Sequence, residues 1–146
     1  MKKYLTWFLC LMILGFCCGQ QGWLPSVVSA KDEASHPTMK SCIEECKRCQ
    51  KVCEETLAYC KKKGGKHAGK AHLNVIQDCI QSCKLSADYM TRESANHMQS
   101  CGFCAEICKA CAETCEQFKG DKQMEKCAQE CRKCAESCEK MSSHKM

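Results

Sequence analysis

Residues 101–115 read Cys-Gly-Phe-Cys-Ala-Glu-Ile-Cys-Lys-Ala-Cys-Ala-Glu-Thr-Cys, so that five cysteines are separated by three, four, three and four positions. Alternating spacings of three and four keep side chains on one face of an α-helix. The intervening residues are largely Glu, Lys and Ala, which suit a wet outer face. This stretch therefore predicts a helix that carries one continuous stripe of thiols.

Comparable stripes recur in three other parts of the chain. Cysteines repeat at helical spacing over residues 42–60 and again over residues 127–138. The stretch over residues 72–90 has fewer cysteines and fills its stripe with His, Ile, Ser and Met instead. The cysteines of the four stripes are Cys42, Cys46, Cys49, Cys53, Cys60, Cys79, Cys83, Cys101, Cys104, Cys108, Cys111, Cys115, Cys127, Cys131, Cys134 and Cys138.

The sequence from Thr38 onward contains no proline and has a helical pattern. The expected helices span residues 38–63, 71–90, 91–119 (beginning at Thr91 or Ser94) and 122–141, with a glycine-rich loop over residues 64–69. Thr38 is the expected N-cap of the first helix, Gly120 the C-cap of the third and Asp121 the N-cap of the fourth. Short connections make consecutive helices antiparallel. The predicted fold is all-α: an up-down-up-down antiparallel four-helix bundle with a cysteine-lined core.

Residues 1–30 have the pattern of a secretory signal peptide. Lysines at positions 2 and 3 precede an apolar run over residues 5–16, and Val28-Ser29-Ala30 supplies a small-x-small cleavage site. The apolar run is too short to span a bilayer permanently. We therefore expect cleavage near Ala30, export to the periplasm or the medium, and no stable membrane insertion.

A lipoprotein is less expected, because the bulky Phe16 precedes Cys17 and Cys18 where a small residue is wanted. The chain then divides into a signal peptide (1–30), an N-terminal linker (31–38) and a four-helix-bundle metal-binding domain (39–146).

Cysteine dominates the composition of the exported part. Of 19 cysteines in 146 residues, three precede residue 31 and sixteen remain, whereas only nine Leu, Ile and Val residues remain with them. Such a chain cannot build a conventional aliphatic core. The charge after residue 30 is +3, from 20 basic and 17 acidic residues that are interspersed. No basic block indicates a nucleic-acid partner.

Several roles are open to so many thiols. Reduced cysteine packs like a small hydrophobe, but sixteen with few aliphatic partners make a weak core. A disulfide-stabilised exported helical structural protein stays an alternative, although bridges between thiols one helical turn apart would be strained. An oxidoreductase is disfavoured because the Cys-x-x-Cys pairs lie inside helices and away from their N-termini. We therefore expect no enzyme activity and no catalytic residues.

Metal binding fits the spacing best. Four Zn(Cys)₄ sites would place about −8 of charge in a dry core whose stripes contain no lysine or arginine. One Cu(I) per thiolate is neutral, and Cu(I) is a soft ion that prefers thiolate and thioether ligands. The expected cargo is multiple Cu(I) ions per chain, and a detoxifying sink for other soft metals such as silver or cadmium remains an alternative.

One end of the predicted bundle gathers weaker soft ligands. The starts of the first and third helices lie there beside the ends of the second and fourth, and we call this end the mouth. The expected mouth residues are His36, Met39, Met90, His97, Met98, Met141 and His144. Thioether and imidazole bind Cu(I) more weakly than thiolate does, so the mouth is the predicted route of metal entry and release. The opposite end holds only His67, His72 and Met124.

These motifs resemble the cysteine-rich four-helix-bundle copper storage proteins. The most specific segment is residues 88–115, where Asp-x-Met-x-Arg-x-Ser precedes the five-cysteine run, and the stripes at residues 42–53 and 127–138 are also similar. The resemblance implies Cu(I) stored along the core, Met and His ligands at the mouth, and a homotetramer of bundles. A copper-requiring enzyme or a copper chaperone would be the partner in transfer.

One departure from exported relatives concerns the signal. Those relatives carry twin-arginine signals, whereas this chain has Lys2-Lys3. We therefore expect export of the unfolded, metal-free chain and copper loading outside the cytosol.

Overall fold

The computed structural model describes residues 38–143, which form four α-helices. The helices are α1 (Met39–Lys63), α2 (Lys70–Thr91), α3 (His97–Glu116) and α4 (Lys122–Ser143), with a short 3-10 helix, η1 (Gly65–Ala68), between α1 and α2. The predicted signal peptide, most of the linker, and the candidate ligands His36 and His144 lie outside the described residues.

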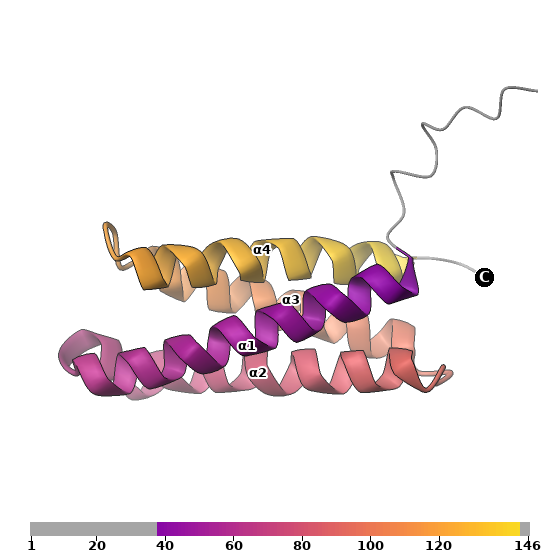
Figure 1. The fold of residues 1–146 in the computed structure, drawn as a ribbon, viewed down its shortest axis with the longest axis horizontal. Coiled ribbons are helices and arrows are strands. Elements are labelled where there is room, and N and C mark those ends of the chain that lie inside the picture. Colours follow the sequence, from indigo (N-terminus) through magenta and orange to yellow (C-terminus); the bar gives the residue numbers. More distant parts are fainter. Residues whose placement is uncertain (1–37, 144–146) are drawn as a thin grey trace, which may run out of the picture.

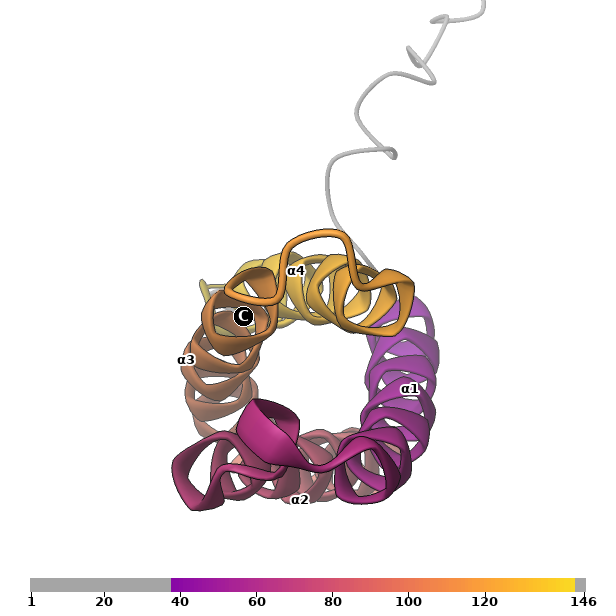
Figure 2. The same ribbon diagram turned by 90° about the vertical axis from the view of Figure 1, so that its left-hand side faces the viewer.

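The helices form the predicted antiparallel bundle, with the order α1, α2, α3, α4 around its axis (Figures 1 and 2). Each helix packs against its two neighbours in this order, and within residues 38–143 the diagonal pairs make no close backbone approach. The mouth carries the start of α1, the turn at 92–96 and the end of α4. The other end, which we call the hairpin end, carries the connections at 64–69 and 117–121 and faces the viewer in Figure 2. No helix in the described part is long and apolar enough to cross a membrane.

Two of the predicted helix caps are confirmed. The Thr38 side chain accepts a hydrogen bond from the Ser41 backbone N–H at 3.2 Å and so begins α1. Asp121 Oδ1 accepts the backbone N–H groups of Gln123 and Met124, at 3.1 and 3.3 Å, and so begins α4. Both side chains satisfy backbone donors that a helix start leaves without partners.

The third helix is shorter than predicted at both ends. It begins at His97, because the chain first makes a turn in which Glu93 has a φ of 51° and the Ser94 hydroxyl accepts from the Asn96 N–H. The prediction that Thr91 or Ser94 caps this helix is therefore wrong, since Thr91 is the last residue of α2. Gly120 is not the C-cap either: α3 ends at Glu116, and Gly120, with a φ of 78°, supplies the left-handed residue of the following turn.

Cysteine fills the interior, as predicted. All sixteen cysteines of the four stripes are at most 1% exposed, and small residues such as Ala105 and Ala112 lie among them. The stripe of α2 is completed by buried His72, Ile76 and Ser86 with Met90 at its end. Among the described residues, no lysine, arginine, aspartate or glutamate is buried in this core.

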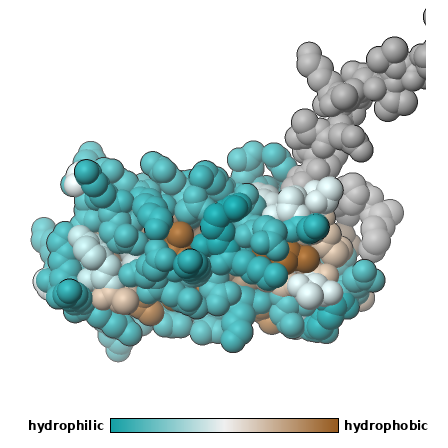
Figure 3. Space-filling model, viewed as in Figure 1, coloured by the Kyte–Doolittle hydropathy of each residue, from teal (hydrophilic) through white to brown (hydrophobic). Residues whose placement is uncertain are grey.

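Charged side chains cover the outside of the bundle, and the face in Figure 3 is mostly hydrophilic with small apolar spots. Some ion pairs join neighbouring helices, for example the two-pronged pair of Arg132 with Glu116 and the 2.9 Å pair of Lys126 with Glu55. Exposed pairs of this kind each contribute little to stability. The fold therefore separates a charged exterior from a thiol-filled interior.

Candidate metal centre

The buried thiols gather into five groups along the bundle axis. Within each group the sulfur atoms all lie within 4.8 Å of one another. From the mouth to the hairpin end, the groups are Cys42–Cys101–Cys138, Cys46–Cys104–Cys134–Cys138, Cys49–Cys83–Cys108–Cys134, Cys49–Cys53–Cys79–Cys131 and Cys53–Cys111–Cys127–Cys131. Each group draws its members from three or four different helices, so that only the folded bundle assembles it.

Neighbouring groups share cysteines and therefore form one continuous ladder. Cys138 belongs to the first and second groups, and Cys134 to the second and third. Cys49 joins the third and fourth groups, and Cys53 and Cys131 join the fourth and fifth. A soft metal ion at one level would thus have ligands in common with an ion at the next level.

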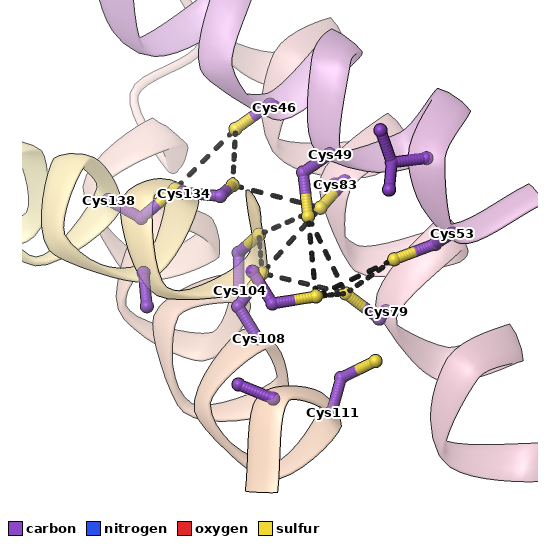
Figure 4. Close-up of a cluster of buried hydrophobic side chains, with 14 of the residues drawn as sticks. Cys46, Cys49, Cys53, Cys79, Cys83, Cys104, Cys108, Cys111, Cys134 and Cys138 are labelled. Atoms are coloured by element: carbon purple, nitrogen blue, oxygen red, sulfur yellow. Dashed lines mark hydrogen bonds between the residues drawn. The ribbon is translucent and has the colours of Figure 1, made fainter. Parts of the chain in front are cut away.

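The sulfur separations suit metal binding better than disulfides. Close pairs include Cys46 with Cys138 at 3.5 Å, Cys53 with Cys131 at 3.6 Å and Cys49 with Cys79 at 3.9 Å, and Figure 4 shows such side chains pointing toward one another. A disulfide needs sulfurs at about 2.05 Å, and all sixteen cysteines of the described chain are free. Metal–sulfur bonds of about 2.3 Å place the sulfurs of a trigonal site about 4.0 Å apart.

Two thiols at the hairpin end, Cys60 and Cys115, have raised pKa values. Burial raises the pKa of the Cys60 thiol to about 11. The neighbouring thiols of Cys111 and Cys127, together with burial, raise the pKa of Cys115 above its usual range. These two thiols are therefore protonated at neutral pH in the absence of metal, and an incoming cation must displace their protons to bind thiolate.

The structure brings the five predicted mouth residues that lie within residues 38–143 to one end of the bundle. The Cys101 thiol donates to Met90 Sδ at 3.7 Å, so this thioether directly extends the first thiol group. Met141 is buried at the end of α4, and Met39 and Met98 are half-buried at the starts of α1 and α3. The structure thus places these four methionines at the mouth.

His97 at the mouth is held in one orientation. Its Nδ1–H donates to the Ser94 carbonyl oxygen at 2.7 Å, and the side chain is buried. A ring whose Nδ1 carries the proton presents Nε2 as the free lone pair, which is the usual state of a metal-binding imidazole.

At the hairpin end, Cys60 and Cys115 belong to none of the five groups. The nearest soft donors to Cys60 are Met124 Sδ, at 3.6 Å, and His72 Nε2, at 3.7 Å. The predicted ligand set omitted His72 and Met124. A sequence signal for both was present, because His72 lies in line with the thiol stripe of α2 and Met124 with that of α4.

Asp121 links three side chains at the hairpin end. Its Oδ2 accepts hydrogen bonds from Tyr59 Oη at 2.7 Å and Lys63 Nζ at 2.5 Å, and His67 Nε2 lies 2.9 Å away. Burial by itself would raise the pKa of Asp121, but these hydrogen bonds and the one from the Met124 N–H hold it well below its usual range. No sequence pattern predicted this cluster, because its members come from separate parts of the chain.

The fold and the site together define a class: a helical bundle whose interior is a ladder of reduced thiols suited to soft metal ions. Residues 35–143 match the sequence model of the copper storage protein family. Because this match covers about three quarters of the chain, the protein belongs to the copper storage protein family.

Solved structures support this assignment. The Nmul_A1745 protein of Nitrosospira multiformis is 40% identical with a TM-score of 0.68, over 72% of this chain and 94% of that chain. The Cu(I)-bound copper storage protein BsCsp3 is 29% identical with a TM-score of 0.68, over 71% of this chain and 97% of that chain. An uncharacterised cysteine-rich protein, YhjQ of Bacillus subtilis (strain 168), is 30% identical over 56% of this chain and 76% of its own length.

Proposed function

We propose that this protein stores Cu(I), binding many ions per chain through the thiolates of its core. The observation that carries the proposal is the ladder of five thiol groups that share members and are sealed from solvent. Cu(I) is the cargo that a related bundle, BsCsp3, holds in its solved structure.

Charge favours Cu(I) over a divalent ion as the cargo. The core of the described chain contains no buried lysine or arginine to balance anionic metal sites. A tetrathiolate site with a divalent ion carries −2, and several such sites in an apolar interior would be strongly unfavourable. One Cu(I) per displaced thiol proton adds no net charge, so the ladder can fill along its whole length.

Entry and release are proposed to take place at the mouth. Met90 already contacts the first thiol group, and Met39, Met98, Met141 and His97 lie at the same end. Thioether and imidazole hold Cu(I) less tightly than thiolate does. The mouth residues would therefore pass ions to and from the ladder without retaining them.

The cellular setting of the protein is also part of the proposal. We expect a non-enzymatic store that is exported after cleavage near Ala30 and that transfers copper to a copper-requiring enzyme or a copper chaperone. The signal-like pattern of residues 1–30 supports export, and family resemblance supports a homotetramer.

An anaerobic Cu(I) titration of the reduced protein against a coloured Cu(I) chelator tests the proposal, after the thiols have been counted. The protein should withhold roughly one ion or slightly fewer per core cysteine before the chelator develops colour. A protein isolated with almost no free thiols that loses to the chelator from the first equivalent would instead be a disulfide scaffold. Parallel competition with Ag(I) and Cd(II) separates copper storage from a general soft-metal sink.

A further inference from the structure

Cys60 occupies a different environment from the cysteines of the ladder. It lies beyond the last thiol group, and its nearest soft donors are a thioether from α4 and an imidazole from α2. Cys60, His72 and Met124 thus bring three different donor types together from three helices. All three side chains are at most 8% exposed.

The distances from Cys60 to the other two donors are close to those of a trigonal site. Metal bonds of about 2.3 Å to sulfur and about 2.1 Å to nitrogen place trigonal ligand atoms about 3.8 to 4.0 Å apart. Cys60 Sγ lies 3.6 Å from Met124 Sδ and 3.7 Å from His72 Nε2. Small rotations of these side chains would open the remaining few tenths of an ångström.

His72 has a buried polar atom that the protein does not satisfy. Its Nδ1 has no hydrogen-bond partner, and its Nε2 faces only the Cys60 thiol. Buried imidazoles normally have an oxygen or nitrogen partner, because burying a polar group without one costs free energy. Its Nε2 has only a thiol, which is a weak hydrogen-bond partner, and a soft cation there would be a stronger one, while Nδ1 would carry the ring proton.

An aromatic ring packs over the site, and a surface pocket lies beside it. The Phe118 ring packs on His72 with ring centroids 4.8 Å apart and on His67 at 4.3 Å. A surface pocket bounded by Lys66, Lys70 and Phe118 has His72 in its wall. An ion could therefore reach this site from the hairpin end without passing along the ladder.

We propose that Cys60, His72 and Met124 form a mixed-donor site for one soft monovalent cation at the hairpin end, separate from the thiol ladder. Binding would replace the Cys60 thiol proton and leave the site neutral. The inference deepens the proposed storage function and rests on it, because Cu(I) is the ion that the ladder is proposed to hold. Ordinary packing of His72 and Met124 around Cys60 is the competing explanation.

Anomalous diffraction at the copper edge from crystals of the Cu(I)-loaded protein tests the site directly. We expect a copper peak within bonding distance of Cys60 Sγ, His72 Nε2 and Met124 Sδ, in addition to the peaks along the ladder. Peaks along the ladder with none at this position would overturn this inference and leave storage intact. A core with no copper at all would overturn the storage function itself.

Two substitutions with a matched control give an independent test in solution. Met124→Leu and His72→Phe keep the volume nearly constant while removing one donor each. Each should lower the number of Cu(I) ions withheld from a competing chelator by about one, or weaken that ion's affinity by at least about tenfold, a change of about 1.4 kcal/mol. Ile80→Leu, at a buried position outside the proposed donors, should leave the number of withheld ions unchanged. If both donor variants withhold as many Cu(I) ions as the wild type with unchanged affinity, His72 and Met124 serve only in packing.

Discussion

The two ends of the bundle carry similar metal-binding side chains but differ in the chain connections and hydrogen bonds that join their helices. At the mouth, only the 92–96 turn joins two helices, and the thioether of Met90 extends a thiol group. At the hairpin end, two connections meet and Asp121 links Tyr59, Lys63 and His67. We expect the site of metal exchange to depend on the supporting backbone as well as on ligand chemistry, because fewer connections join the helices at the mouth.

The largest expected difference is in copper capacity, between a cysteine of the ladder and Cys60 at the hairpin end. Cys131 belongs to two thiol groups, whereas Cys60 belongs to none. Cys131→Ala should therefore remove roughly two Cu(I) ions from the capacity, because it takes one ligand from each of two thiol groups. Cys60→Ala should remove about one ion. Chelator competition measures both capacities, and circular dichroism checks that each variant is helical. Equal losses from the two variants would contradict the sharing of ligands.

Substitutions at the two ends should also differ in their effect on the rate of copper transfer. Replacing Met90 and Met141 together with leucine should slow copper transfer to a chelator by about tenfold, the effect of about 1.4 kcal/mol on a barrier. Met124→Leu is the matched control at the hairpin end and should leave the rate of the main phase unchanged. Stopped-flow absorbance gives both rates. A larger effect from Met124→Leu would move the principal route to the hairpin end.

The free energy of unfolding should depend on the hydrogen bonds that Asp121 makes at the hairpin end. Asp121→Ala removes an N-cap together with hydrogen bonds to charged and neutral partners. It should lower the free energy of unfolding of the reduced, metal-free protein by about 2 kcal/mol. Asp88→Ala removes an exposed pair with Arg92 toward the mouth and should cost less than about 0.5 kcal/mol. Urea unfolding under reducing conditions measures both changes. Similar values for the two variants would show that the contacts of Asp121 do not stabilise the hairpin end.

The pH dependence of stability at the same residue gives a smaller effect. The folded protein holds the pKa of Asp121 below its value in the unfolded chain, so the stabilisation is complete above about pH 5 and declines as the pH falls further. The difference in unfolding free energy between the wild type and Asp121→Asn should therefore shrink between pH 5 and roughly pH 2 to 3. A difference in unfolding free energy that grows as the pH falls would contradict a lowered pKa of Asp121 in the folded protein.

Periodic features of this fold were predictable, and features that depend on distant contacts were not. The spacing of the cysteines predicted four helices and a buried thiol stripe on each, because a helix repeats at a fixed angle. The ends of α3 were harder to predict: Thr91 and Ser94 both suit an N-cap, and only the turn around Glu93 decides between them and His97.

The same limit applies to the candidate site. The residues of the mouth followed from chain order, since antiparallel helices bring particular ends together. The contacts of Cys60 with His72 and Met124 depend on the rotation of three helices about their axes. The cluster around Asp121 needs the path of two loops as well, which no repeat in the sequence encodes.

The absence of buried lysine, arginine, aspartate and glutamate from the described core has a consequence for how the protein is recognised. If each Cu(I) replaces one thiol proton, empty and full molecules carry the same net charge and present the same outer electric field. On a native gel they should migrate together when their shapes agree, while mass spectrometry separates them by the copper bound. A partner that must distinguish full from empty bundles would therefore have to sense the shape or stiffness of the mouth, because long-range electrostatics cannot report the load.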